Sequence, residues 1–183
     1  MFGFESEGVY NKTDVDGFDV EHPALADKAG LADEKTYGLY ANLFVKVDPV
    51  KAGFVYAYGS ADEDDGSFNW GDDFDVLTVM DDYIANTDDA GLTGYTVYKV
   101  YADVTFGKIS AGLAFGYGKN NADWSSNETK DGKFTEYDAN VSYAFDANTT
   151  YTIAGGLAKT KDFFAKDLDA DAYRIYHKMA VKF

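Results

Sequence analysis

The chain contains no cysteine and only two prolines among its 183 residues. The absence of cysteine excludes disulfide bonds, thiol catalysis and cysteine-based zinc sites. The scarcity of proline leaves room for many extended strands. No apolar run approaches the ~18 residues that a membrane-spanning helix requires, which excludes a helical membrane protein. No basic segment followed by an apolar one begins the chain, so we expect an exported protein to be mature or truncated here.

Basic residues are also scarce. Lysine and arginine number 16 against 32 acidic residues, which gives a formal net charge of -16. Nucleic acid is therefore excluded as a partner, because phosphate contacts need clustered lysine and arginine. Aromatic residues, by contrast, make up 17% of the chain, although the mean hydropathy is only -0.34. This combination is typical of a soluble all-β sandwich or of a transmembrane β-barrel with a polar lumen.

Period-two alternation of apolar with polar or small residues favours the barrel. It recurs in seven stretches, and an eighth, weaker one runs from Phe2 to Tyr10. Aromatic residues gather at both ends of the apolar face, at a spacing of roughly 20–25 Å along tilted strands, which matches the height of a lipid-facing band. We assign them to two interfacial girdles. One girdle contains Tyr37, Tyr58, Tyr98, Tyr117, Tyr137 and Tyr173, and the other contains Phe106, Phe145, Tyr151 and Phe183.

The connections between these stretches alternate between short and long. Short turns are expected at 48–50, 107–108 and 146–148, and long loops near 13–34, 61–93, 119–131 and 160–171. Outer-membrane barrels place short turns in the periplasm and long loops outside. The sequence therefore predicts one domain over residues 1–183, an all-β transmembrane antiparallel β-barrel of about eight strands with both ends periplasmic.

The face opposite the apolar one carries the charges of the strands. We expect it to line the pore, with Lys46, Lys99, Asp103, Asp138, Arg174, Lys178 and Lys182 as pore-lining residues. Such charges either create a field that orients polar solutes or merely keep the lumen wet. The sequence leaves both interpretations open.

Residues 61–93 contain eleven acidic side chains and no basic one. A charge run of this kind is usually a solvated loop, but an inward fold would narrow the pore. The apolar run 74–80 within it is expected to pack inside the barrel mouth or on a neighbouring subunit. The acidic residues of this candidate constriction loop are Asp72, Asp73, Asp75, Asp81 and Asp82.

Three segments carry a family resemblance: YGLYANLFVKVDPVKAGFVYAYGS, GKISAGLAFGYGKN and the tail from Tyr173 to Phe183. They resemble the C-terminal part of the major outer membrane porin (major outer membrane protein) family of Campylobacter and its relatives. The resemblance implies a Gram-negative outer-membrane protein, a longer parent barrel and a homotrimer. A terminal phenylalanine is the signal that the barrel insertion machinery reads. Eight strands close only a narrow barrel, whereas ~16–18 leave an aqueous channel, so we expect part of a larger barrel.

Calcium is the metal that the sequence suggests, because hard cations take several carboxylate oxygens and relatives of the resembled porin are thought to bind it. The acidic runs lack the twelfth-position glutamate of an EF-hand, so no ligands are assigned and the metal site stays unknown. We expect no other cofactor. No nucleophile, base and orienting acid converge on one strand end, so we expect no catalytic residues and no enzyme.

The function we expect is that of a porin. Ions and small hydrophilic solutes would diffuse passively through a water-filled pore bounded by outer-membrane lipid. The alternative is a small eight-stranded structural or adhesive barrel, whose long acidic loops bind a surface partner and which has no open channel.

Overall fold

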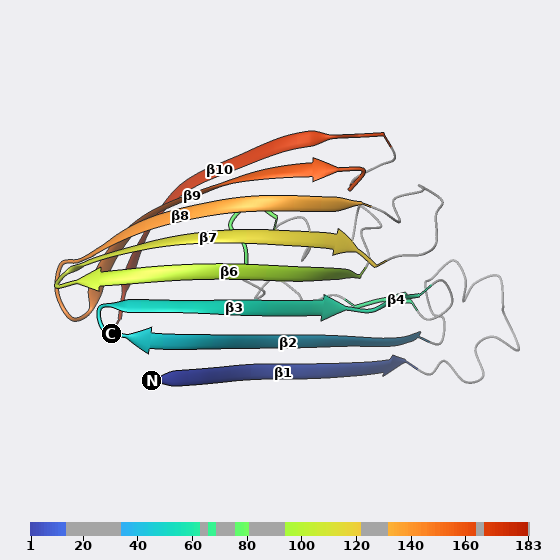
Figure 1. The fold of residues 1–183 in the computed structure, drawn as a ribbon, viewed down its shortest axis with the longest axis horizontal. Helices are drawn as coiled ribbons and strands as arrows, with labels where there is room; N and C mark the ends of the chain where they lie inside the picture. Colours follow the sequence, from blue (N-terminus) through green and yellow to red (C-terminus); the bar gives the residue numbers. More distant parts are fainter. Residues whose placement is uncertain are drawn as a thin grey trace, which may run out of the picture.

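The structure is a computed structural model that describes residues 1–13, 34–62, 66–68, 76–80, 94–121, 132–163 and 167–182. Its main feature is one sheet of eight antiparallel strands, side by side in the order β1-β2-β3-β6-β7-β8-β9-β10 (Figure 1). The strands are β1 (Phe2–Thr13), β2 (Glu34–Val47), β3 (Val50–Gly59), β6 (Tyr95–Phe106), β7 (Ile109–Asn120), β8 (Lys133–Ala144), β9 (Thr149–Lys161) and β10 (Ala170–Val181).

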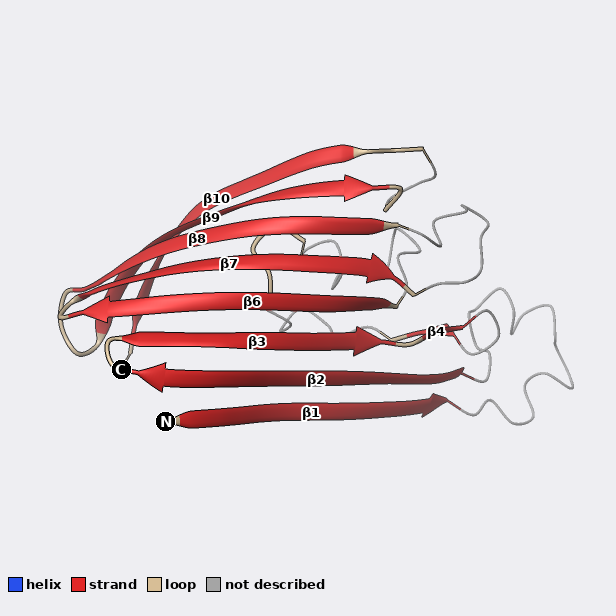
Figure 2. Ribbon diagram, in the orientation of Figure 1, coloured by secondary structure: helices blue, strands red, loops and turns tan. Residues whose placement is uncertain are grey.

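Two short strands form a separate hairpin beyond the end of β3. β4 (Ala61–Asp62) pairs with β5 (Gly66–Ser67), inside the long loop expected from residue 61. The described residues contain strands, turns and bends but no helix (Figure 2). None of them forms a helix of a length and apolar character that could cross a bilayer.

Short and long connections lie at opposite ends of the sheet. Turns at 48–49, 107–108 and 145–148 join neighbouring strands. Residues 1 and 182 lie at this same end, which is the left end in Figure 1. The Asp146 carboxylate stabilises the last of these turns, because its Oδ1 accepts the backbone N–H groups of Asn148 and Thr149, each at 2.8 Å.

The eight-strand prediction is confirmed, but several boundaries were wrong by one or two residues. The turn expected at 146–148 begins at residue 145, and the loops expected at 119 and 160 begin only after β7 and β9 end at Asn120 and Lys161. β10 likewise begins at Ala170, inside the loop expected to reach 171. The ends of β7 and β9 and the start of β10 carry polar residues, so the apolar alternation fades before the backbone pairing does. At β8 the difference is the reverse, because the apolar Phe145 lies beyond the last strand residue, Ala144.

The sheet is open. β1 pairs only with β2, and β10 pairs only with β9, so each edge strand has one side without a partner strand among the described residues. Figure 2 shows β8, β9 and β10 curving away from the plane of the other strands. The backbone groups along both edges are therefore available to further strands.

Strand pleating gives the sheet two chemically different faces, because successive side chains point to opposite sides. We call the face that carries Lys99, Glu136 and Asp138 the inner face, and the opposite one the outer face. Register places Leu43, Phe54, Val100 and Phe115 together on the outer face, each opposite the next across four strands. All four are at least 36% exposed. The buried hydrophobic cluster lies on the inner face instead.

Candidate functional site

A five-residue segment of the chain, Val76–Met80, lies against the inner face of the sheet. We call it the inner segment. Four of its side chains are buried, those of Val76, Leu77, Val79 and Met80. It belongs to the apolar run 74–80 singled out in the sequence. The sequence predicted packing inside the barrel mouth or on a neighbouring subunit, and the structure shows that the described part of the run packs on the inner face of the sheet of its own chain.

One carboxylate on β8 binds the backbone of the inner segment. Glu136 Oε1 accepts the N–H groups of Thr78 and Val79, both at 2.7 Å, and Oε2 accepts the N–H of Met80 at 2.9 Å. Glu136 is itself fully buried. A buried carboxylate is costly unless it is hydrogen-bonded, and three N–H donors from successive residues satisfy it. Glu136 therefore fixes both the position and the local backbone shape of the segment.

Two basic side chains bind carbonyl groups of the same segment from other strands. Lys99 Nζ on β6 donates a hydrogen bond to the carbonyl oxygen of Val76. Arg174 Nη1 on β10 donates to the carbonyl oxygen of Thr78 at 3.3 Å. The inner segment is thus held by polar groups from β6, β8 and β10, and it crosses the intervening strands.

Two glycines let the segment approach the sheet closely. A Cβ atom at Gly116 on β7 would lie 2.6 Å from Leu77 Cδ2, and one at Gly156 on β9 would lie 2.9 Å from Val79 Cγ2. Both distances are shorter than carbon atoms tolerate. The missing side chains therefore form two recesses that receive Leu77 and Val79.

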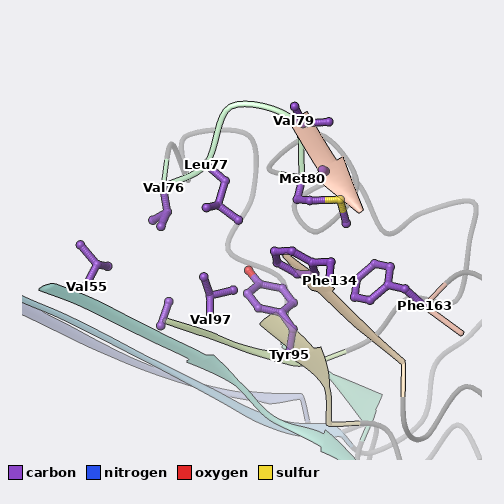
Figure 3. Packing of buried hydrophobic residues seen from close by; sticks show 11 residues of the cluster. Val55, Val76, Leu77, Val79, Met80, Tyr95, Val97, Phe134 and Phe163 are labelled. Atoms are coloured by element: carbon purple, nitrogen blue, oxygen red, sulfur yellow. The ribbon is translucent and has the colours of Figure 1, made fainter. Parts of the chain in front are cut away.

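An apolar cluster covers the inner face near the long connections (Figure 3). Tyr95, Val97, Phe134 and Phe163 are each no more than 1% exposed and pack with the inner segment. The rings of Phe134 and Phe163 meet edge to face, with centroids 5.3 Å apart. Apolar side chains therefore fill this end of the inner face. A polar cavity lies next to the cluster, toward the short turns.

The polar cavity has a volume of about 290 Å³ and lies beside the inner segment. Charged and amide groups line it, among them Asn42, Lys51, Lys99, Asp103, Asp138 and Asn140. Lys51 Nζ lies 4.3 Å from the centre of the Phe44 ring and 5.5 Å from that of Tyr101. The Tyr101 hydroxyl donates to Asn42 Oδ1 at 3.2 Å. The cavity is therefore a polar space lined by ionisable groups of both signs.

The predicted pore-lining residues all lie on the inner face, at different depths. Lys99, Asp103 and Asp138 border the cavity, and Arg174 binds the inner segment. Alternation along β2 and β10 places three more lysines on the inner face, closer to the short turns: Lys46, Lys178 and Lys182. Each carboxylate oxygen of Asp138 is buried without a hydrogen-bond partner among the described residues.

The candidate constriction residues of the acidic loop lie outside the described residues, namely Asp72, Asp73, Asp75, Asp81 and Asp82. The inner segment lies between them in sequence.

Sequence reasoning missed Glu136, the carboxylate that binds the inner segment. Its signal was present, since it stands on the inner side of β8 two residues before Asp138. Among the described residues, no group of three or more histidine, cysteine, aspartate or glutamate side chains is arranged to hold a metal ion.

Several aromatic side chains on the outer face are in ring-to-ring contact. The rings of Tyr37 and Tyr58 stack with centroids 5.7 Å apart, and those of Tyr98 and Tyr117 at 6.5 Å. Near the short turns, Tyr143 and Phe145 meet edge to face at 5.1 Å. Phe183 lies outside the described residues. The described girdle residues therefore form contacts at both ends of the outer face.

The girdles are less sharply separated than the alternation suggested. The ring centroid of Tyr98 lies 6.4 Å from that of Phe54 and 5.4 Å from that of Tyr56. These contacts extend the girdle near the long connections toward the middle of the face.

Comparison with protein-family models and with curated proteins gave no match to this chain.

Proposed function

We propose that this chain forms part of the wall of an outer-membrane porin, through which ions and small hydrophilic solutes diffuse passively. One observation carries the proposal: a single sheet has an apolar, exposed outer face, and an inner face that combines charged residues with a buried cluster and holds a segment of its own chain. A contiguous apolar surface of this size on a soluble protein would be an aggregation hazard. Contact with lipid on one side and water on the other removes the conflict.

The dimensions of the strands support a membrane position. Twelve-residue strands such as β6, β7 and β8 rise roughly 40 Å along their own axes, and about 30 Å once tilted by ~40°. This covers the apolar band of a bilayer together with part of each interface. Leu113, near the middle of β7, is 68% exposed, as expected of a residue that faces acyl chains.

The two open edges support a larger barrel. Backbone N–H and C=O groups cannot remain unpaired within the hydrocarbon region, so β1 and β10 require partner strands there. A barrel of ~16–18 strands, in which these eight are a part, satisfies both edges and leaves an aqueous bore. The same proposal includes an outer-membrane location, insertion directed by the C-terminal strand, and trimerisation as implied by the family resemblance.

The inner segment narrows the passage in this proposal. It occupies the inner face opposite β6 to β10, and the cavity beside it retains fixed charges of both signs. Such a lining favours hydrated solutes over apolar ones. Passive diffusion needs no catalytic residue and no cofactor, and calcium has no assigned ligand in the described part of the chain.

Single-channel recording tests the proposal. The protein that contains these eight strands within its complete barrel, purified and reconstituted into planar bilayers, should give discrete, stable conductance steps at both voltage polarities. Circular dichroism on the same preparation establishes that the strands have formed. A folded, bilayer-inserted protein without conductance would overturn the pore and favour the closed structural barrel instead.

A further inference from the structure

In the described strands, the charged residues on the outer face all lie at the end with the long connections. On β7, β8 and β9 its charged side chains are four lysines: Lys119, Lys133, Lys159 and Lys161. All four are exposed. They lie just beyond two tyrosines of the girdle near the long connections. Tyr117 precedes Lys119 by two residues, and Tyr137 follows Lys133 by four.

Three of these lysines are direct cross-strand neighbours. Lys119 on β7 is opposite Lys133 on β8, and Lys133 is opposite Lys161 on β9. The ends of these three strands lie next to one another in Figure 1. Strands are spaced ~4.8 Å apart, so the three residues span about 10 Å. Lys159 lies two residues before Lys161 on the same face and faces Asp171 on β10.

This arrangement is unfavourable in isolation. Like charges directly opposite each other on a sheet repel and destabilise the pair. The chain as a whole has a net charge of -16. A cluster of lysines without acidic residues between them is therefore unusual for this composition. A row of three adjacent cations therefore points to an anionic ligand that neutralises it.

We propose that Lys119, Lys133, Lys159 and Lys161 form a binding site for phosphate groups of lipid headgroups in the outer leaflet. We call these residues the lysine row. The inference rests on the proposed membrane position of the sheet. Interfacial tyrosines mark the headgroup level, and lysines immediately beyond them reach anionic headgroups while their aliphatic stems cover apolar surface.

Two further lysines lie on the outer face at another part of the sheet. Lys12 on β1 is directly opposite Lys35 on β2, again on the outer face and at the end with the long connections. At the end with the short turns, the outer-face positions Val47, Val50, Phe106 and Ile109 are apolar. The lysines of the outer face therefore lie at the end with the long connections, which outer-membrane barrels place outside the cell.

Lipid retention measured by native mass spectrometry tests the site. The detergent-solubilised protein is mixed with lipid A, a glycolipid with two phosphates, or with phosphatidylcholine, whose headgroup has no net charge. We expect retention of lipid A and not of phosphatidylcholine. The triple variant Lys119→Gln/Lys133→Gln/Lys161→Gln should weaken lipid A binding on the order of a hundredfold, at roughly fivefold for each lysine near an anionic surface.

Two further variants keep the test specific. The matched control Lys46→Gln/Lys178→Gln/Lys182→Gln removes the same charge from the inner face and should leave lipid A retention unchanged. Lys119→Arg/Lys133→Arg/Lys161→Arg keeps the charge and should retain the lipid. Equal losses in both glutamine triples would overturn the inference, as would inorganic phosphate displacing the lipid at equal concentration.

The two proposals fail in different ways. Conductance without lysine-dependent lipid retention overturns the lysine row and leaves the pore standing. Lysine-dependent retention without conductance overturns the pore and leaves the lysine row standing. Loss of both in a folded protein overturns both.

Discussion

The outer and inner faces of the sheet are built from the same strands with the same period of two, yet they are organised in opposite ways. The outer face leaves large side chains such as Leu113 and Ile175 more than two-thirds exposed. The inner face buries even a carboxylate, Glu136, under a segment of its own chain. The outer face thus offers apolar surface without hydrogen-bonding groups, whereas the inner face forms specific hydrogen bonds.

The largest effect is expected from placing a charge on the outer face. Leu113→Lys should destabilise the folded protein in lipid vesicles by about 3 kcal/mol, because a lysine at mid-bilayer on the lipid face is costly. The neighbouring Ala114→Lys, on the inner face beside the polar cavity, should cost much less. Urea titration of both variants measures the difference. Equal costs would mean that the outer face does not contact lipid.

The next effect concerns the anchor on the inner face. Glu136→Ala removes the acceptor of three backbone N–H groups and should weaken docking of the inner segment by about 2 kcal/mol, since hydrogen bonds to a charged group contribute ~1.5–3 kcal/mol each and water replaces part of them. Because the chain has no cysteine, Met80→Cys provides a single thiol at a fully buried position.

That thiol reports docking directly. Maleimide labelling of Met80→Cys should be slow with Glu136 present and at least tenfold faster in the Glu136→Ala background, with larger conductance steps in the same variant. Glu7→Gln, which removes a carboxylate from the inner side of edge strand β1, serves as the control and should leave labelling slow. Unchanged labelling in Glu136→Ala would show that the apolar contacts alone hold the segment.

A smaller effect is expected at the glycine recess on β7. Gly116→Ala places a methyl group 2.6 Å from Leu77 Cδ2, so the leucine must move at a cost of about 1 kcal/mol. Gly8→Ala on β1 meets nothing within 4 Å and should be neutral or mildly stabilising. Chemical denaturation compares the two. A stabilising Gly116→Ala would contradict the recess.

The smallest effect belongs to a turn outside both faces. The N–H groups of Asn148 and Thr149 hold the pKa of the Asp146 carboxyl below its ordinary value of 3.8, with Asn148 the larger cause. A lowered pKa in the folded state stabilises the turn above pH ~3.8, and this stabilisation is lost as pH falls through the folded pKa. Amide chemical shifts of residues 148 and 149 should titrate together in that range, and Asp146→Asn should abolish the titration.

Alternation predicted the strands well where both faces are chemically distinct. β6 and β7 were identified over most of their length because Val100, Ala102 and Val104 alternate with Lys99, Tyr101 and Asp103. β1 was weaker in sequence, since Ser6 and Gly8 stand at outer-face positions. Its place in the sheet depends on backbone hydrogen bonds with β2, and backbone pairing cannot be recognised from the residue types of a strand.

The functional features were harder to predict because they depend on contacts between distant residues. Glu136 and Thr78 are 58 positions apart in sequence, and nothing local to either indicates the pairing. Lys119 and Lys161 fell in segments expected to be loops, so their common outer face was not apparent until the full strand lengths were known. Only the register places them in one row with Lys133.

The strictly sequential strand order has a consequence for how the sheet assembles. Every strand of the sheet after β1 pairs with the preceding long strand of the chain, so each added strand needs only the strand before it in the sheet. The three tight turns make the β2–β3, β6–β7 and β8–β9 hairpins the fastest steps, because short loops close with the least loss of chain entropy.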